Sequence, residues 1–219
     1  DTLEKSILEL ENQIQKEQII LIDLAKNIHH NRKNSLPSLT KMLISILSQL
    51  GMPNVQFNIE LTFSDTFFSN GKDTIQFLIS TNKGSDFGLL KKVASGGEMS
   101  RIMLAVKAVL AQYSSLPTLI FDEIDTGISG EVAHKAGLVM EELSAGHQVI
   151  AITHLPQIAS KGSNHLFVYK GLDNNRTVTR IRKLTQEERT TEIAKMLGGD
   201  KVTEAALENA RELLALDRR

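Results

Sequence analysis

The chain has 219 residues, with 25 basic and 26 acidic side chains and a formal net charge of −1. Its apolar share of 41% is typical of a folded globular protein and excludes intrinsic disorder over most of the chain. The balanced charge excludes a generally basic protein that coats nucleic acid, but it leaves room for a local basic face. Cysteine is absent, which excludes disulfides, thiolate catalysis and cysteine-ligated zinc sites. No apolar stretch is long enough to span a membrane.

The first 33 residues are predicted to form one helix with a coiled-coil seam. Apolar residues recur at alternating spacings of four and three, and Glu and Lys dominate the other faces. Because one strand of a coiled coil is unstable alone, we expect a partner strand. Pro37 is predicted to interrupt this helix, and a second helix with a new phase to run on to Gly51. The seam consists of Leu3, Ile7, Leu10, Ile14, Glu17, Leu21, Leu24 and Ile28, of which only Glu17 is polar.

The next region, residues 55–79, contains most of the eight phenylalanines and is predicted to form a β-hairpin. Apolar and polar residues alternate over residues 55–61 and again over residues 75–79. The two runs are separated by a turn signal, Asn70-Gly71. We therefore expect an antiparallel pair of strands.

After residue 93, helices are predicted to alternate with short, fully apolar strands. We expect a helix over residues 98–111, a strand over 118–121, a helix over 130–143 and a strand over 148–152. This alternation predicts an α/β fold with a parallel sheet covered on both faces. The first helix is predicted to turn Met99, Ile102, Met103, Val106 and Leu110 inward.

The last 55 or so residues, counted from residue 165, are predicted to form a hairpin followed by two helices. The hairpin strands cover residues 165–170 and 177–184. Residues 185–188 match a capping box that opens a helix ending at Gly198-Gly199. A final helix is expected over residues 203–216.

Two adjacent carboxylates, Asp122 and Glu123, follow the strand at residues 118–121 directly. Ligands bind at this edge of open α/β sheets. The first carboxylate of such a pair is suited to hold Mg²⁺ and the second to orient a water for attack on a phosphate. A third acid, Asp125, lies in the loop that follows. The pair by itself is equally compatible with a strand that ends in a polar turn.

Two further segments have the chemistry of a phosphate site. In Ser95-Gly96-Gly97-Glu98, the glycines permit close backbone approach, and the helix that begins there aims its amides forward. Taken alone, this segment is better explained as a plain serine N-cap with a glycine turn. His154 ends the strand at residues 148–152, and we expect it beside Asp122 because parallel neighbours end at the same edge.

Taken together, these segments resemble the carboxy-terminal lobe of an ABC-type ATPase head, with its signature loop, Walker B strand, D-loop and switch histidine. The amino-acid sequence is similar to that of the RecN family of SMC-like DNA repair ATPases, and the similarity covers nearly the whole chain. It is carried by VASGGEMSRIMLAVKAVLA, TLIFDEIDTGISGEVA, QVIAITHLPQIAS and EIAKMLGG.

The resemblance implies a parallel-sheet lobe of an ABC/SMC-type P-loop ATPase head, with antiparallel strands and an amino-terminal coiled-coil helix. By this resemblance, ATP and Mg²⁺ would bind between two engaged heads. Asp122 would hold Mg²⁺, Glu123 would position the attacking water and His154 would sense the γ-phosphate. Asp125 would communicate across the head–head interface.

The signature loop would act on ATP bound to the second head. Ser95 and Gly97 would contact its γ-phosphate, within a nucleotide-binding set made of Ser95, Gly96, Gly97 and Glu98.

The resemblance also implies a division of the chain and a set of partners. Residues 1–33 would be the root of the returning coiled coil, and residues 34–219 the head lobe, in three parts at 34–92, 93–164 and 165–219. The expected partners are an amino-terminal lobe of the same protein, a second head in a homodimer, and DNA during double-strand-break repair and recombination. The full protein would work in the bacterial cytoplasm at the nucleoid.

A phosphate loop of the GxxxxGK[ST] type is absent from the sequence. Its one Gly-Lys pair is Gly71-Lys72. The motif also requires a glycine five positions before Gly71, but Thr66 occupies that position. With a first residue that is Asp1 rather than Met, this predicts a part of a longer protein. The isolated chain is expected to be inactive as an ATPase.

Three alternatives remain open at this point. One is another kind of SMC or ABC ATPase head. Another is a metal-dependent phosphohydrolase that uses Asp122, Asp125 and His154 directly. The third is a non-catalytic coiled-coil module, which accounts for residues 1–50 and leaves residues 94–154 unexplained.

Overall fold

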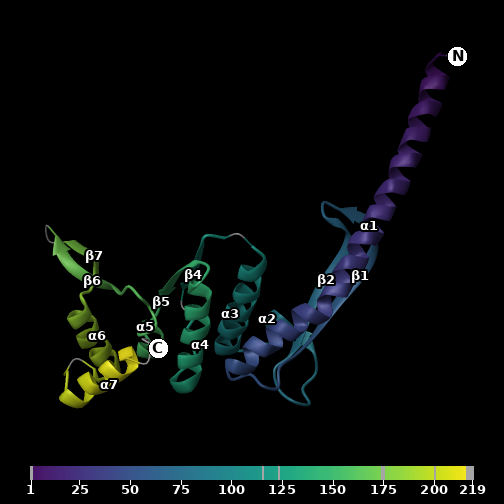
Figure 1. Ribbon diagram of the computed structural model, residues 1–219. Coiled ribbons are helices and arrows are strands. Elements are labelled where there is room, and N and C mark those ends of the chain that lie inside the picture. Colours follow the sequence, from purple (N-terminus) through teal and green to yellow (C-terminus); the bar gives the residue numbers. More distant parts are fainter. Residues whose placement is uncertain (1, 115, 123, 174–175, 200, 216–219) are drawn as a thin grey trace. The chain divides into compact units, whose positions relative to one another are not determined.

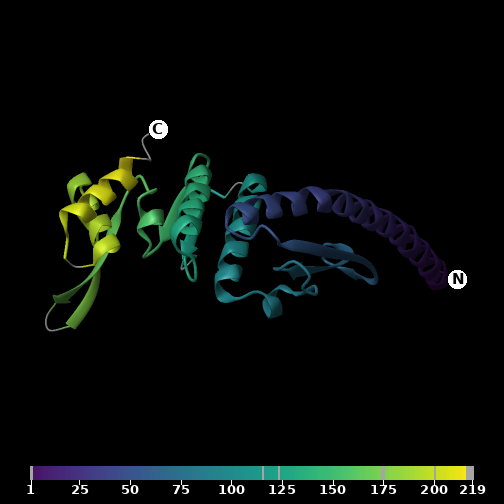
Figure 2. The same cartoon turned by 90° about the horizontal axis from the view of Figure 1, so that it is seen from below.

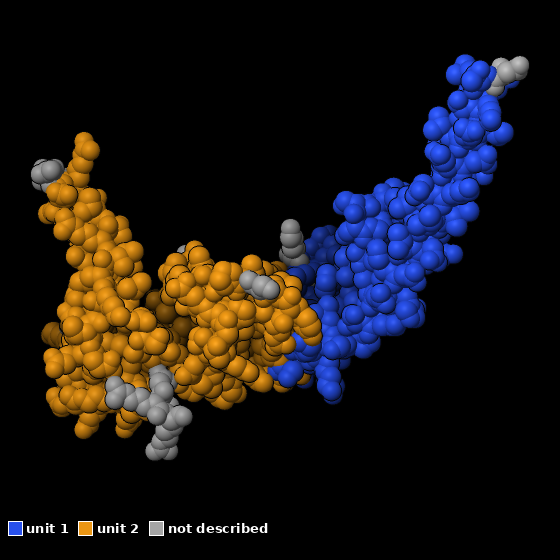
Figure 3. All heavy atoms as spheres, turned by 45° about the horizontal axis from the view of Figure 1, so that its top comes forward, with its two compact units in different colours: residues 1–45, 54–93 blue, residues 46–53, 94–219 orange. Residues whose placement is uncertain are grey.

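The computed structural model describes residues 2–114, 116–122, 124–173, 176–199 and 201–215 (Figure 1). The chain forms two compact units, coloured separately in Figure 3. Unit 1 comprises residues 1–45 and 54–93, and unit 2 comprises residues 46–53 and 94–219. Within the described ranges, no helix is both long and apolar enough to cross a membrane.

The first helix, α1, runs from Thr2 to Gln49 without interruption, so the predicted break at Pro37 is wrong (Figure 2). A proline in a helix removes one backbone hydrogen bond and crowds the preceding turn. That cost is offset by anchoring on both sides: Arg32 bonds to the sheet of unit 1, and Leu43 and Leu47 are fully buried. Tertiary packing therefore overrides the local signal.

Gly51 ends this helix, as predicted. Its φ of 78° lies in the left-handed region that favours glycine. The amide of Met52 bonds to the carbonyl of Leu47 at 2.9 Å, and that of Gly51 bonds to Ser48 at 3.3 Å. These are the two bonds of a Schellman motif, which satisfies the last carbonyls of the helix.

The heptad seam of α1 remains open to solvent. Its apolar members are between 37% and 74% exposed. Exposed apolar side chains at this spacing form a surface onto which a second helix packs. The members are Leu3, Ile7, Leu10, Ile14, Leu21, Leu24 and Ile28.

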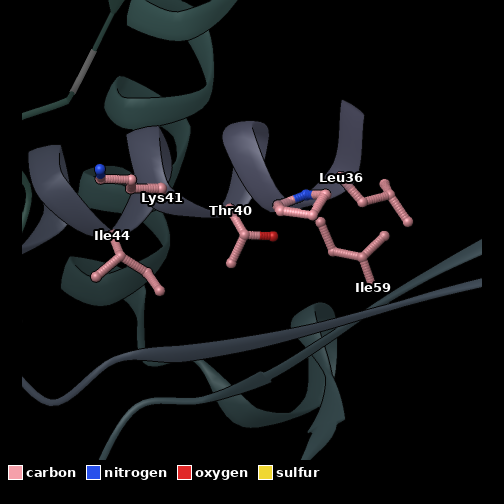
Figure 4. A pocket seen from close by; sticks show the side chains of 6 residues that line it. Leu36, Thr40, Lys41, Ile44 and Ile59 are labelled. Atoms are coloured by element: carbon pink, nitrogen blue, oxygen red, sulfur yellow. The ribbon is translucent and has the colours of Figure 1, made fainter. Parts of the chain in front are cut away.

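The predicted hairpin of unit 1 is confirmed. Strands β1 (Gln56–Phe68) and β2 (Gly71–Ser80) pair antiparallel, and both are longer than the sequence pattern indicated. A short strand, β3 (Gly88–Leu89), adds to β2 and leads into α2 (Leu90–Val93). An apolar groove lies between α1 and β1, with Leu36 and Ile44 on one side and Ile59 on the other (Figure 4).

A buried carboxylate ties α1 to this hairpin. The side chain of Asp73 is 2% exposed, and its oxygens accept bonds from Arg32 Nη1 at 2.8 Å and His29 Nδ1 at 2.6 Å. Arg32 also donates to the carbonyl of Asn70, and the Lys72 ammonium lies over the Phe63 ring. Burial alone would raise the pKa of Asp73, but the hydrogen bonds and charges of Arg32 and His29 outweigh it and lower that pKa below 3.8.

Unit 2 has the predicted alternation of helices and strands. Its elements in chain order are α3 (Gly96–Tyr113), β4 (Thr118–Asp122), α4 (Gly130–Ser144), β5 (Gln148–Ile152) and α5 (Pro156–Ala159). The parallel pairing of β4 with β5 is confirmed, with a register from Thr118 opposite Gln148 to Asp122 opposite Ile152.

The prediction that helices cover both faces of this sheet is wrong. Phe121 is fully buried, whereas Ile120 is 56%, Ile150 41% and Ile152 55% exposed. The described part of the chain supplies two parallel strands and leaves one face of them open. A fully apolar strand therefore predicts that both of its faces are apolar. It does not predict that elements of the same chain cover both faces.

The inward face of α3 was also predicted only in part. Ile102 is fully buried as expected, but Met103 and Leu110 are 41% and 56% exposed. Ala105 and Ala108 are buried in their place. Small side chains allow the helix to approach its neighbours closely. A prediction based on large apolar residues does not identify such alanines as buried.

The carboxy-terminal elements match the prediction closely. The hairpin strands are β6 (Leu166–Asp173) and β7 (Arg176–Lys183), and part of the predicted turn, residues 174–175, lies outside the described residues. The capping box of Thr185 and Glu188 opens α6 (Gln186–Gly198), which packs against α7 (Glu204–Ala215). Their common core is Ile193, Ala194, Ala206 and Ala210.

Replacing Asp73 by Asn is expected to lower the free energy of local unfolding of the α1–β2 contact by about 1–3 kcal/mol, because Arg32 then faces no carboxylate. Since the folded pKa of Asp73 is lowered, its contribution is present above about pH 4 and is lost as pH falls through that folded pKa. Hydrogen exchange of the β2 amides at pH 7 and pH 3 measures both effects.

The matched control is Asp65→Asn, which removes an exposed carboxylate from β1. Equal protection of β2 in the two variants at pH 7 would show that the Asp73 cluster does not hold α1 to the hairpin.

Candidate functional site

The amino terminus of α3 is fixed by a capping box. The hydroxyl of Ser95 accepts the amide of Glu98 at 3.4 Å, and the Glu98 carboxylate accepts the amide of Ser95 at 2.8 Å. The serine N-cap considered from the sequence is therefore present, and Glu98 is part of it. Ser95 and Gly96 are both exposed, so the start of α3 is open to solvent, while the amides of Glu98 and Met99 are bonded to Ser95. Such a helix start attracts anions.

Two glycines bring the start of α3 against the loop after β4. A Cβ built on Gly97 would lie 2.9 Å from the carbonyl oxygen of Gly127, and one built on Gly127 would lie 3.0 Å from the Cα of Gly97. Gly127 also has a φ of +73°. Any side chain at either position would force the two backbones apart. The contact places Ser95-Gly96-Gly97 beside the loop that holds Asp125.

The carboxylate of Asp122 is exposed at the carboxyl end of β4, where the sequence places it. Glu123 lies outside the described residues. No group of three or more His, Cys, Asp or Glu side chains with the geometry of a metal site occurs among the residues that are described. A single exposed carboxylate can hold Mg²⁺ only together with phosphate and water oxygens, which is the usual way proteins bind this ion.

Asp125 is the most enclosed of the predicted site residues, with 3% exposure. Its Oδ2 accepts a bond from the Thr153 hydroxyl at 2.6 Å and one from the His154 amide at 2.9 Å, and it lies 3.1 Å from Nδ1 of the His154 ring. The imidazole itself is 75% exposed. The structure thus brings His154 to Asp125, and its place beside Asp122 stays a prediction.

Two residues of this site were not singled out from the sequence. Thr153 bridges Asp125 and the amide of Leu155, and the only signal for it was a hydroxyl next to the strand-terminal histidine. Arg101 donates to the carbonyls of Gly97 at 3.1 Å and Leu50 at 3.3 Å, so it joins the start of α3 to the end of α1. A basic residue in the first turns of a helix gave no indication of that contact.

Comparison with known proteins gives a consistent result. No protein-family model matches the chain. The chain is 42% identical to the DNA repair protein RecN of Vibrio cholerae over 191 residues, covering 87% of this chain and 34% of that protein. It is 45% identical to RecN of Bacillus subtilis over 144 residues, covering 66% of this chain and 25% of that protein. The chain therefore spans about a third or less of the length of these relatives.

Among solved structures, the Smc head domain with a coiled coil and joint from Pyrococcus yayanosii matches with a TM-score of 0.59 at 19% identity, covering 89% of this chain and 37% of that one. A structure from work on ATP-driven dimerisation and DNA-stimulated activation of SMC ATPases matches with a TM-score of 0.52 at 17% identity, covering 79% and 99%. These likenesses show the fold of an SMC head, as the sequence predicted. With the sequence relatives, they establish that this chain belongs to the RecN family of DNA repair proteins.

Proposed function

We propose that this chain forms the carboxy-terminal half of an SMC-like ATPase head. The full-length protein would bind ATP between two heads, hydrolyse it, and use the cycle during DNA double-strand-break repair in the bacterial cytoplasm. The observation that carries the proposal is the Gly97–Gly127 contact, because it sets a helix start suited to phosphate beside the loop that follows the acidic end of β4.

The start of α3 is the proposed contact for the γ-phosphate of ATP held by the opposite head. The hydroxyl of Ser95 accepts the Glu98 amide, which leaves its own proton to donate to a phosphate oxygen. The backbone amide of Gly96, an exposed residue, is a further donor, and the positive end of the helix dipole favours the anion. ATP bound in this way holds two heads together.

The end of β4 is the proposed reaction centre of the chain's own head. Asp122 is suited to hold Mg²⁺, which would neutralise charge on the phosphate oxygens when bound. Glu123 would orient the attacking water and accept its proton. The exposed imidazole of His154 would donate from Nε2–H to the γ-phosphate, since Nδ1 faces Asp125 at 3.1 Å.

Open apolar surfaces support a composite head. The described strands β4 and β5 form an isolated pair, as do β6 and β7, and two-stranded sheets of this kind are marginal alone. Ile150 and Ile152 on β5 are exposed, and so are Leu166 and Val168 on β6, each 57%. The amino-terminal lobe, which would also carry the phosphate loop, is the proposed partner for these surfaces, and the outgoing coiled coil for the seam of α1.

The alternative of a self-contained metal-dependent phosphohydrolase is disfavoured by the burial of Asp125. Its carboxylate already accepts bonds from Thr153 and His154 and is closed to solvent. It is therefore unavailable as a second metal ligand beside Asp122.

Replacing Glu123 by Gln in the full-length protein is expected to lower kcat for ATP hydrolysis by about 10²–10⁴-fold, because the attacking water loses its base. ATP-dependent association of heads should persist, since Gln has nearly the same shape. Steady-state phosphate release and size-exclusion chromatography with ATP measure the two properties. Glu142→Gln, on an exposed part of α4, is the control. Normal turnover by Glu123→Gln would exclude it as the base.

Replacing Ser95 by Asp is expected to abolish ATP-dependent head association and turnover. Asp retains the helix cap, so α3 should still fold, but its carboxylate repels the phosphate. Ser95→Thr keeps both the cap and the hydroxyl and should remain active. Thermal unfolding compares the folds, and association is measured as above. An active Ser95→Asp protein would show that the start of α3 does not contact ATP.

A further inference from the structure

The loop that carries His154 is attached to the carboxylate of Asp125 by two hydrogen bonds, and the His154 ring lies close to the same carboxylate. The Thr153 hydroxyl, the His154 amide and the His154 ring all meet the same oxygen, Oδ2, at 2.6, 2.9 and 3.1 Å. Two of them belong to His154 itself, one from its backbone and one from its side chain. The backbone position of this histidine is therefore set by Asp125, and its Nδ1 faces the same carboxylate.

Burial makes this attachment stiff. Asp125 is 3% exposed, and its neighbours Ile124 and Ile128 are buried as well. An enclosed carboxylate that lost its donors would incur a large desolvation penalty, so the loop cannot move away without cost. Thr153 strengthens the arrangement, because its hydroxyl also accepts the amide of Leu155 at 3.0 Å.

The attachment has a direct effect on which ring nitrogen faces other groups. With Nδ1 facing Asp125 at 3.1 Å, Nε2 is the nitrogen left to meet a phosphate, to which it donates when it carries a proton, and the 75% exposed ring leaves it accessible. A carboxylate behind an imidazole commonly fixes its orientation in this way. By contrast, the sequence resemblance assigned Asp125 to the interface with the second head.

We propose that Asp125 is a positioning residue for His154 of its own head. It holds the Thr153–His154 loop so that Nε2 meets the γ-phosphate of the ATP bound by that head. The inference rests on the proposed function, because it needs His154 to face ATP. In this proposal, the loop after β4 holds His154 in place within its own head. The exposed residues of the same loop remain available to contact the second head.

Mixed dimers of the full-length protein separate action within a head from action across the interface. The reference dimer pairs a Ser95→Asp protomer with a wild-type protomer and has one intact composite site. In the first test dimer, Asp125→Ala is on the same protomer as Ser95→Asp, so the intact site uses the His154 that has lost Asp125. In the second, Asp125→Ala is on the other protomer, and the intact site uses a His154 with its Asp125 in place.

The proposal predicts that kcat of the first dimer falls about 10²-fold below the reference, because His154 is displaced, while the second dimer matches the reference. The reverse pattern, equal loss in both dimers or no loss in either would overturn it. A Ser95→Asp homodimer that still hydrolyses ATP would instead refute the proposed function, so the two failures are distinguishable.

Variants of Thr153 test the same attachment without touching the carboxylate. Thr153→Val removes the hydroxyl and should lower kcat while leaving KM for ATP and the thermal unfolding midpoint close to wild type. Thr153→Ser restores the hydroxyl and should restore kcat. The loss in Thr153→Val combined with Asp125→Ala should be smaller than the sum of the two single losses. Additive losses, or a defect that Ser does not rescue, would overturn the proposal.

Discussion

The close approach of two backbones, at Gly97 and Gly127, is the constraint on which the candidate site depends. With a nearest distance of 2.9 Å from a Cβ at Gly97 to the carbonyl oxygen of Gly127, neither position admits a side chain without displacement. The contact joins the start of α3 to the loop after β4. A shift of either backbone would separate the start of α3 from the loop that holds Asp125.

A second level of order comes from the parallel pairing of β4 and β5. Because the two strands end together, the loops that follow them lie close enough for Asp125 to accept bonds from Thr153 and His154. Because the Asp125 carboxylate is buried, losing these donors would cost desolvation free energy. The hydrogen bonds in turn restrict the movement of Thr153 and His154. The site is thus held by one backbone contact and one buried acceptor, both between segments far apart in the sequence.

Large apolar surfaces of the described residues are not covered by other described residues. They include the seam of α1, the open face of β4 and β5, and the apolar side chains of β6. Ordinary monomers do not leave so much apolar area exposed. The chain spans about a third of its RecN relatives, and these surfaces are where the proposed composite head would be completed.

The sequence by itself determined the elements that depend on local patterns. The capping boxes at Ser95 and Thr185, the glycine end of α1 and the apolar runs of β4 and β5 were all predictable, because periodicity and capping act within a few residues. The kinds of side chain at the site, which are carboxylates, a hydroxyl, glycines and a histidine, could also be identified from the sequence. Only the tertiary structure decided that α1 continues through Pro37, that Met103 and Leu110 face outward, and that Asp125 turns inward to His154. Each of these outcomes depends on packing and hydrogen bonding between segments far apart in the sequence. The free energy of these contacts exceeds the conformational preference of the local sequence.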